Sequence, residues 1–391
     1  MGNWLWLGSA ALLCLQWIVL HMAGVPLAPE FQTLSTGVAI FGAAFLLSWA
    51  AELAQLEMSQ ALALALLALI AVLPEYAVDM YFAWMAGKHP AYTAYATANM
   101  TGANRLLIGV GWAAVVFTYW LKTGKKSFTL APAHKIEIFY LGLATLYSFF
   151  IPFKKQLDLF DALVLITIFV FYIRAASRAT HVEPELEGPS EMLTRWGVQP
   201  RRVATIVLFF LSGYTIFISA EPFAEGLLAT GRTFGIEEFI LVQWLAPLAS
   251  ESPEFIVAIL FALRANPEAS IGTLISSKVN QWTLLIGMLP LVYMFSAGQI
   301  MPMQMDSRQA EEILLTAAQS LFAVAILANL SFSLMEAALL FVLFATQLLI
   351  PDPRFRYFYS FLYIAFTAGM FLALRQVREA FIALFLRQSK T

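Results

Sequence analysis

Twelve apolar runs, each about as long as a lipid bilayer is thick, follow one another along this chain and constrain its fold most. With 60% hydrophobic and only 12% charged residues, the chain cannot bury so much apolar surface in a water-soluble core. We therefore expect an all-α integral membrane protein with about twelve spans. Its main interaction partner is the surrounding lipid bilayer. The runs occupy residues 4–23, 35–56, 60–87, 91–121, 135–152, 157–176, 203–229, 236–264, 267–296, 311–330, 332–350 and 356–374.

One long polar stretch, residues 177–202, divides these runs into two groups. It contains HVEPELEGPSE, whose prolines, glycine and charges are typical of a linker. The expected organisation has five parts: an extra N-terminal span in 1–34, a first repeat in 35–176, the linker in 177–202, a second repeat in 203–350, and an extra span with a tail in 351–391.

Lysines and arginines outside the runs fall mostly on one side of the expected membrane, as with Lys122, Arg178 and Arg375. Because cytoplasmic loops carry this excess, we expect both termini and the linker to be cytoplasmic in a cell membrane. A net charge of −2 gives no basic field for nucleic acid. The chain has no G-x-S-x-G, H-E-x-x-H or Walker motif, which indicates that it is not an enzyme.

The two groups of runs contain related sequences. A shift of 179 residues places LPEYAVDMYFAWMAG (73–87) on SPEFIVAILFALRAN (252–266), so that Pro74-Glu75 coincides with Pro253-Glu254. The sequence LLIG also occurs in both copies, at 106–109 and 284–287. Each copy holds five runs, an odd number, so the second copy must cross the membrane upside down. The sequence thus predicts an inverted 5+5 repeat with two extra helices, an organisation typical of secondary transporters.

Each copy places a glutamate directly after a proline within an apolar run. Pro74 and Pro253 each remove a helical hydrogen bond, which should free the carbonyls of Ile70 and Ala249. Acids at membrane depth are costly unless they are paired or bind an ion, so they are functional candidates. We expect Glu75 and Glu254 to approach one another and to neutralise one divalent cation between them.

Ca²⁺ takes six to eight oxygen ligands, so two glutamates need further donors. The next run of each copy supplies an amide, Asn104 or Asn280. Hydroxyl groups precede these amides by three or four residues and share their helix faces: Thr101, Ser276 and Ser277. Two more acids lie one turn from the paired glutamates, Asp79 and Glu251. Each of these acids is either part of an ion or proton relay or a member of a salt bridge.

At these residues the sequence resembles the cation/calcium exchanger superfamily. That superfamily carries G-[TS]-S-x-P-E and then a G-S-N-rich segment in each of its two repeats. Here the first copy has AVLPE and TGANRLLIG, and the second has ASESPE and SSKVNQWTLLIG. The resemblance implies ten core helices with an ion site between the repeats. It also implies liganding glutamates at Glu75 and Glu254, a hydroxyl ligand at Ser250, and amide ligands at Asn104 and Asn280.

The resemblance further implies a secondary active antiporter that exchanges Ca²⁺ against Na⁺ by alternating access, with the transported ions in place of any cofactor. The sequence departs from the superfamily pattern in four places: Ala71 and Val72 replace hydroxyl residues, Glu251 is additional, and Lys278 replaces a glycine. The alternative is a proton-coupled calcium exchanger in which Asp79 or Glu251 carries protons. Whether the chain forms a homo-oligomer stays open.

Three further charged residues need partners at membrane depth. An unpaired ammonium is costly there, so Lys278 is expected to pair with Glu251, Glu225 or Asp79 or to lose its proton. A sharper hypothesis is that it acts as a tethered cation in place of sodium. Glu52 and Glu225 are either gating acids or partners of Arg105 and Lys278. The two extra spans contain no strong candidate ligand and are expected to be peripheral.

Overall fold

The computed structural model describes residues 2–56, 73–178, 186, 188–348, 353–373, 375, 378, 379, 381 and 382. Within them the chain is helical apart from loops and four short strands. In the first half the elements are α1 (Gly2–Met22), α2 (Pro29–Gln55), α4 (Leu73–Lys88), α5 (Tyr92–Leu106), η1 (Leu107–Trp112), α6 (Ala113–Thr123), β1 (Ser127–Thr129), η2 (Pro132–His134), α7 (Lys135–Ser148), α8 (Ile151–Lys154), β2 (Gln156–Leu157) and α9 (Leu159–Ala176). In the second half they are α10 (Pro189–Thr194), α11 (Val198–Phe234), α12 (Glu238–Leu263), α13 (Pro267–Asn280), η3 (Gln281–Leu285), α14 (Ile286–Ala297), β3 (Met303–Gln304), α15 (Ser307–Leu327), β4 (Ser331–Ser333), α16 (Leu334–Leu348) and α17 (Pro353–Ala373).

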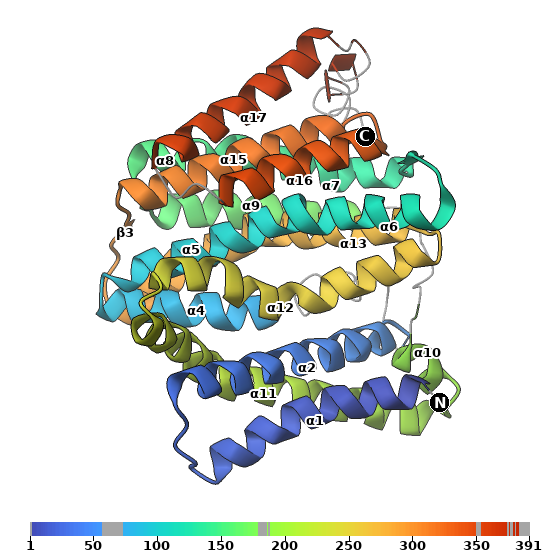
Figure 1. Cartoon of the computed structure of the whole chain (residues 1–391), viewed down its shortest axis with the longest axis vertical. Helices are drawn as coiled ribbons and strands as arrows, with labels where there is room; N and C mark the ends of the chain where they lie inside the picture. Colours follow the sequence, from blue (N-terminus) through green and yellow to red (C-terminus); the bar gives the residue numbers. More distant parts are fainter. Residues whose placement is uncertain are drawn as a thin grey trace.

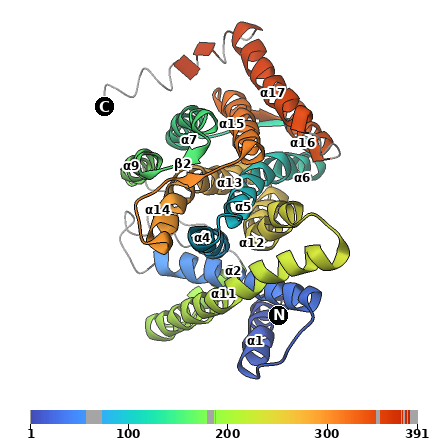
Figure 2. The same ribbon diagram turned by 90° about the vertical axis from the view of Figure 1, so that its left-hand side faces the viewer.

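The long helices lie side by side and form a stack (Figure 1). At one end α2 packs along α11, and α1 covers this pair. At the other end α15 packs against α17 and α7. Figure 2 shows α4, α5 and α12 between these two ends. The helices that carry the candidate site residues therefore occupy the middle of the molecule.

Eight helical segments of the described residues are long and apolar enough to cross a membrane, and a bent α12 makes a ninth. This confirms the predicted all-α membrane fold. Three of the twelve expected runs, the third, the eleventh and the twelfth, are not among these nine segments. Part of the third run falls in 57–72, outside the described residues. The described part of α16 ends at Leu348, two residues before the end of the expected run, and α17 carries Arg354 and Arg356 near the start of its described residues.

Two small antiparallel sheets connect the repeats outside the helices. β1 pairs with β4, where Phe128 faces Phe332, and β2 pairs with β3, where Leu157 faces Met303. β1 and β3 occupy equivalent loops of the two repeats, as do β2 and β4. If the repeats had the same orientation, β1 would lie on the same side as β3. It pairs instead with β4, and this crossed arrangement confirms that the second repeat is inverted.

The long span after each Pro-Glu helix contains a π-helical segment. In the first repeat η1 separates α5 from α6, and in the second η3 separates α13 from α14. A π-segment adds a residue to the turn and so rotates the side chains that follow, which is why such segments are frequent at functional sites. Asn104 lies three residues before η1, and Asn280 lies directly before η3. Each candidate amide thus stands at the change in helix register.

α12 bends by 55° between Glu238–Ser252 and Glu254–Leu263, and Pro253 lies at the bend. This agrees with the loss of a backbone hydrogen bond at proline. The described part of α4 starts at Leu73, one residue before Pro74. The expectations for Ile70, Ala71 and Val72 concern positions outside the described residues.

Candidate functional site

Four carboxyl groups from two helices form the centre of the candidate site. Glu75 and Asp79 come from α4 in the first repeat, and Glu251 and Glu254 come from α12 in the second. Glu75, Asp79 and Glu251 are 2%, 0% and 1% exposed, and Glu254 is partly buried. Glu75 lies close enough to the other three for their charges to interact. Four carboxylates in this space would repel one another unless protons or cations offset their charge.

Glu75 accepts hydrogen bonds from both repeats. Its Oε1 accepts from the Asn99 amide of α5 at 3.1 Å, and its Oε2 accepts from the Ser250 hydroxyl of α12. Because Ser250 lies on α12 four residues before Glu254, this bond joins α4 directly to α12. Both Glu75 oxygens are oriented by these neighbours, an arrangement that suits a ligand.

Several oxygens of the same cluster accept no hydrogen bond from the described residues. They are both oxygens of Asp79, one oxygen each of Glu251 and Glu254, and the Asn99 amide oxygen. Buried polar atoms are normally satisfied, so such a group of atoms is typical of a place where protons or ions bind. Among the described residues, no three His, Cys, Asp or Glu side chains form a group that could hold a metal ion by themselves. Hydroxyl and amide oxygens also bind Ca²⁺, and Ser250 and Asn99 supply them beside Glu75.

The second repeat orients Glu251 through the first residue of its π-segment. The Gln281 amide donates to Glu251 Oε1, and its nitrogen also lies 3.5 Å from the Ser277 hydroxyl. Ser277 therefore contacts Gln281, and Gln281 in turn contacts the Glu251 carboxyl group. Gln281 itself is 1% exposed, so its amide is dedicated to this contact.

Asn280 joins the candidate site to the first repeat. Its Oδ1 accepts from the Tyr76 hydroxyl of α4 at 2.7 Å. Its amide nitrogen has no partner among the residues that the structure describes. An oxygen already engaged by Tyr76 is not free for a cation in this arrangement.

Lys278 is fully buried, and the expected pairing with Glu251, Glu225 or Asp79 is wrong. Its Nζ donates to the Asn104 side-chain oxygen at 2.8 Å and to the Asn104 carbonyl at 3.2 Å. The ammonium also lies 4.4 Å from the centroid of the Trp282 ring. Within the described residues no carboxylate oxygen lies within ion-pair distance of it. The reason is packing: α5 lies against this part of the second repeat and presents Asn104 there.

Two other predicted site residues make hydrogen bonds to groups other than the four carboxyl groups. The Thr101 hydroxyl donates to the Thr97 carbonyl of its own helix at 2.7 Å. The Ser276 hydroxyl shares a hydrogen bond of 2.8 Å with Tyr172 of α9. The structure thus does not bring Thr101 or Ser276 to the four acids.

The expected pairing of Glu52 or Glu225 with Arg105 or Lys278 is also wrong. Glu225 accepts from the hydroxyls of Tyr81 and Tyr92 at 2.9 and 2.7 Å. Glu52 accepts from the Ser190 hydroxyl of α10. The partner of Arg105 is Glu312, at 2.5 Å.

Asn99, Gln281 and Tyr76 contact the candidate site residues but were not predicted from the sequence. A shift of 179 residues aligns the Pro-Glu segments of the two copies, and it places Asn99 opposite Lys278 in the alignment. The LLIG segments need a shift of 178, and at that shift Asn99 coincides with Ser277, a second small polar residue. Alignment of the second segment by itself would therefore have indicated Asn99.

A family model described as sodium/calcium exchanger protein matches residues 31–177 and 204–351. Among solved structures, an H⁺/Ca²⁺ exchanger, CAX, is 47% identical with a TM-score of 0.94, covering 99% of this chain and 98% of that chain. Native YfkE is 17% identical with a TM-score of 0.61, covering 95% and 100%. The sodium-calcium exchanger NCX_Mj is 15% identical with a TM-score of 0.54, covering 83% and 97%. At such identities the last two show the fold alone. No curated protein matches the sequence.

Proposed function

This chain belongs to the sodium/calcium exchanger protein family, and we propose that it is a proton-coupled calcium antiporter. Its membership confirms the resemblance predicted from the sequence and makes it a cation/calcium exchanger. Sodium coupling, the first expectation, becomes the less favoured form. The observation that carries this choice is the 47% identity, over nearly the whole chain, to a structure described as an H⁺/Ca²⁺ exchanger.

The arrangement of acids supports proton coupling on physical grounds. Ca²⁺ brings two positive charges, whereas Glu75 interacts electrostatically with three other carboxyl groups. Acids of this kind can take up protons when the divalent ion leaves and release them when it binds. A carboxyl group that exchanges protons must not be fixed by strong donors. Asp79 comes nearest to this condition, because neither of its oxygens accepts a hydrogen bond of ordinary geometry from the described residues, although the Asn99 amide is near enough to act on it.

In the proposed mechanism Glu75 and Glu254 bind the calcium ion directly. Ser250 and Asn99 orient Glu75, and their oxygens are available as additional ligands. Asp79 and Glu251 each lie one helical turn from a binding glutamate and carry the protons. The bend of α12 at Pro253 brings Glu254 to the cluster from the inverted repeat.

Lys278 supports the same choice against sodium. Its ammonium occupies both oxygens that Asn104 could offer to a small cation. A sodium ion would have to displace this tethered charge before Asn104 could bind it. A proton needs no such oxygen cage.

The test is calcium uptake by proteoliposomes under one imposed gradient at a time. Vesicles with an acidic lumen and no sodium gradient should take up external Ca²⁺, detected with a dye enclosed in the lumen. An outward sodium gradient at equal pH should drive no uptake. Protein-free vesicles and vesicles in which a protonophore with a potassium ionophore has collapsed the pH gradient are the controls. Uptake driven by sodium alone at constant pH would show that the coupling ion is Na⁺.

A further inference from the structure

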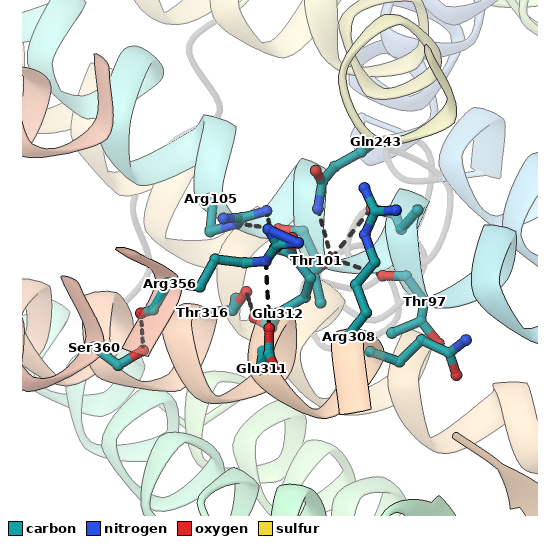
Figure 3. Close-up of polar contacts among 12 residues, drawn as sticks. Thr97, Thr101, Arg105, Gln243, Arg308, Glu311, Glu312, Thr316, Arg356 and Ser360 are labelled. Carbon is teal, nitrogen blue, oxygen red and sulfur yellow. Dashed lines mark hydrogen bonds and ion pairs between the residues drawn. The ribbon is translucent and has the colours of Figure 1, made fainter. Parts of the chain in front are cut away.

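Outside the candidate cation site, four charged side chains form a buried cluster, Arg105, Glu311, Glu312 and Arg356. Glu312 Oε2 lies 2.5 Å from the Arg105 guanidinium, and Glu312 Oε1 lies 3.2 Å from Nε of Arg356. Glu311 Oε2 lies 3.7 Å from the same Arg356 nitrogen. Both arginine side chains point toward the two glutamates in Figure 3. Glu312 thus connects the two arginines through different oxygens.

The charges of the cluster balance, because it holds two arginines and two glutamates. Glu312 is 3% exposed, Arg105 is 2% exposed, and the side chain of Arg356 is 11% exposed. Removing one member leaves an uncompensated charge in a poorly solvated place, which is more costly than the intact cluster. Without Arg356, Glu311 would lose its ion-pair partner among the described residues, and its negative charge would stand beside that of Glu312.

The members come from three different helices. Arg105 belongs to α5, both glutamates belong to α15, and Arg356 belongs to α17, outside the two predicted repeats. Further contacts hold Arg105 from two sides. Its guanidinium lies 4.9 Å from the centroid of the Trp244 ring of α12, and its carbonyl accepts from Gln319 of α15 at 3.4 Å.

α5 is also the helix that lines the cation site with Asn99 and Asn104. Arg105 follows Asn104 directly and precedes η1 by two residues. A helix next to a π-segment can change register there, because the extra residue of the wider turn can shift along the chain. A fixed Arg105 therefore sets both the rotation and the axial position of α5, and with them the place of the Asn99 amide that binds Glu75.

We infer that Arg356 is a positioning residue for cation binding: it fixes Glu312, which holds Arg105 and thereby fixes α5 at the site. This inference rests on the proposed function for its transport consequences. It gives α17 a role beyond peripheral packing. Arg356 acts through its charge: without it, the unbalanced Glu311 carboxylate repels Glu312 and displaces it together with the Arg105 that Glu312 holds.

Three variants test the inference. Arg356→Gln should raise the calcium KM of exchange by about fivefold or more, because a misplaced Asn99 weakens the orientation of Glu75. Glu311→Gln together with Arg356→Gln removes one charge of each sign and should return the KM to near the wild-type value. Arg354→Gln is the matched control, since it removes an exposed arginine from the same turn of α17 and should leave the KM unchanged.

Hydrogen–deuterium exchange provides a readout that does not require transport. In Arg356→Gln the amides of residues 92–106 should exchange faster than in the wild type and in Arg354→Gln, and the double variant should restore slow exchange. If the wild type exchanges no calcium, the proposed function fails while this measurement still tests the positioning. Unchanged exchange and unchanged KM in folded Arg356→Gln would overturn the inference. A defect of Arg356→Gln that Glu311→Gln does not relieve would overturn it as well, because charge balance would then not be the cause.

Discussion

Glu75 is the residue at which chemistry and packing depend on each other most directly. Its carboxyl accepts hydrogen bonds from Asn99 in one repeat and from Ser250 in the other. It is thus one of several links between the two repeats. A substitution that keeps its shape and removes its charge therefore separates ligation from packing.

Glu75→Gln is expected to abolish calcium exchange, with a loss of at least about a hundredfold, while the protein stays folded. The amide keeps the size of the carboxyl and a hydrogen-bonding oxygen, but it loses the negative charge that binds the cation. Uptake into proteoliposomes measures the activity, and size-exclusion chromatography in detergent measures folding. Glu191→Gln, at an exposed position of α10, is the control. Wild-type flux in folded Glu75→Gln would remove Glu75 from the site.

Lys278→Ala is expected to make calcium flux respond to sodium. The substitution removes the ammonium from the two Asn104 oxygens and leaves a polar space at which a sodium ion can bind. Alanine is preferred to glycine because it preserves the helix. The measurement is uptake at fixed pH with and without an outward sodium gradient. If flux per folded molecule and its response to sodium equal those of the wild type, Lys278 is not a tethered cation.

For single residues, the sequence predicts well which acids belong to the candidate site and poorly which residues contact them. The duplicated Pro-Glu pair identifies Glu75 and Glu254 because proline and a charge are both costly in an apolar helix. It cannot identify Glu312 as the partner of Arg105, since the two are separated by about half of the chain and only the packing of α5 against α15 brings them together. The expected acid partner of Lys278 fails for the same reason, because an amide on another helix satisfies its ammonium.

Among the elements, α5 and α12 approach one another most closely at Gly102. A Cβ atom there would overlap the backbone carbonyl of Gln243 and the start of its side chain. The Gln243 amide also lies 3.5 Å from the Thr101 hydroxyl. Glycine at this position lets a helix of the first repeat lie directly on a helix of the second.

Gly102→Ala is therefore expected to destabilise the protein by about 1–3 kcal/mol, because backbone cannot move aside as a flexible side chain can. The melting temperature in detergent, from intrinsic fluorescence, measures the effect. Gly213→Ala in α11 is the matched control. Nothing lies within 4 Å of a Cβ at that position, so alanine should stabilise its helix slightly. Equal melting temperatures for the two variants would contradict the close approach.

Asp158 begins α9 in the loop after β2 and supplies its N-cap. Its side chain accepts from the backbone N–H groups of Phe160 and Asp161 at 2.9 and 3.1 Å, and Lys154 lies 3.1 Å away. Partial burial by itself would raise the pKa of Asp158. The hydrogen bond from Asp161 and the Lys154 ammonium outweigh it and lower the pKa from 3.8 to about 2.

Asp158→Ala is expected to cost about 1 kcal/mol at neutral pH through the lost cap. The folded-state pKa lies below the ordinary value, so the charge stabilises the fold above pH 3.8, and this contribution disappears as the pH falls through about 2. The difference in melting temperature between wild type and variant should shrink over that window. Asp158→Asn retains an acceptor and should lose less at neutral pH. A difference that does not depend on pH would show that the charge plays no part.

The sequence predicts the helical class and the proline bend, because apolar length and proline act locally. It does not predict the π-segments. Nothing in the residues of η1 or η3 favours the wider turn over an ordinary one, so contacts with neighbouring helices decide it. The short strands are equally invisible in the sequence, since each exists only through pairing with a distant loop.

For the whole molecule, the crossed sheets fix which loops share a side of the membrane. β1 and β4 must lie on one side and β2 and β3 on the other. Single cysteines in a Cys14→Ala background test this arrangement, since Cys14 is the only cysteine of the chain. Ser127→Cys and Ser333→Cys should react with a membrane-impermeant maleimide from the same side, and Gln156→Cys and Gln304→Cys from the opposite side. Labelling of Ser127→Cys and Ser333→Cys from opposite sides would exclude an inverted repeat.

The crossed pairing also limits how such a protein could have arisen. One repeat by itself would carry one strand for each sheet and one Pro-Glu helix, so it could complete neither sheet nor site. If the two copies were inserted in the same direction, β1 and β3 would lie on one side of the membrane and β2 and β4 on the other. Neither observed pair, β1 with β4 or β2 with β3, could then form. Only two copies inserted in opposite directions could assemble this architecture. An ancestor encoded by a half-length gene would thus have needed dual topology, and gene fusion would then have fixed one orientation for each half.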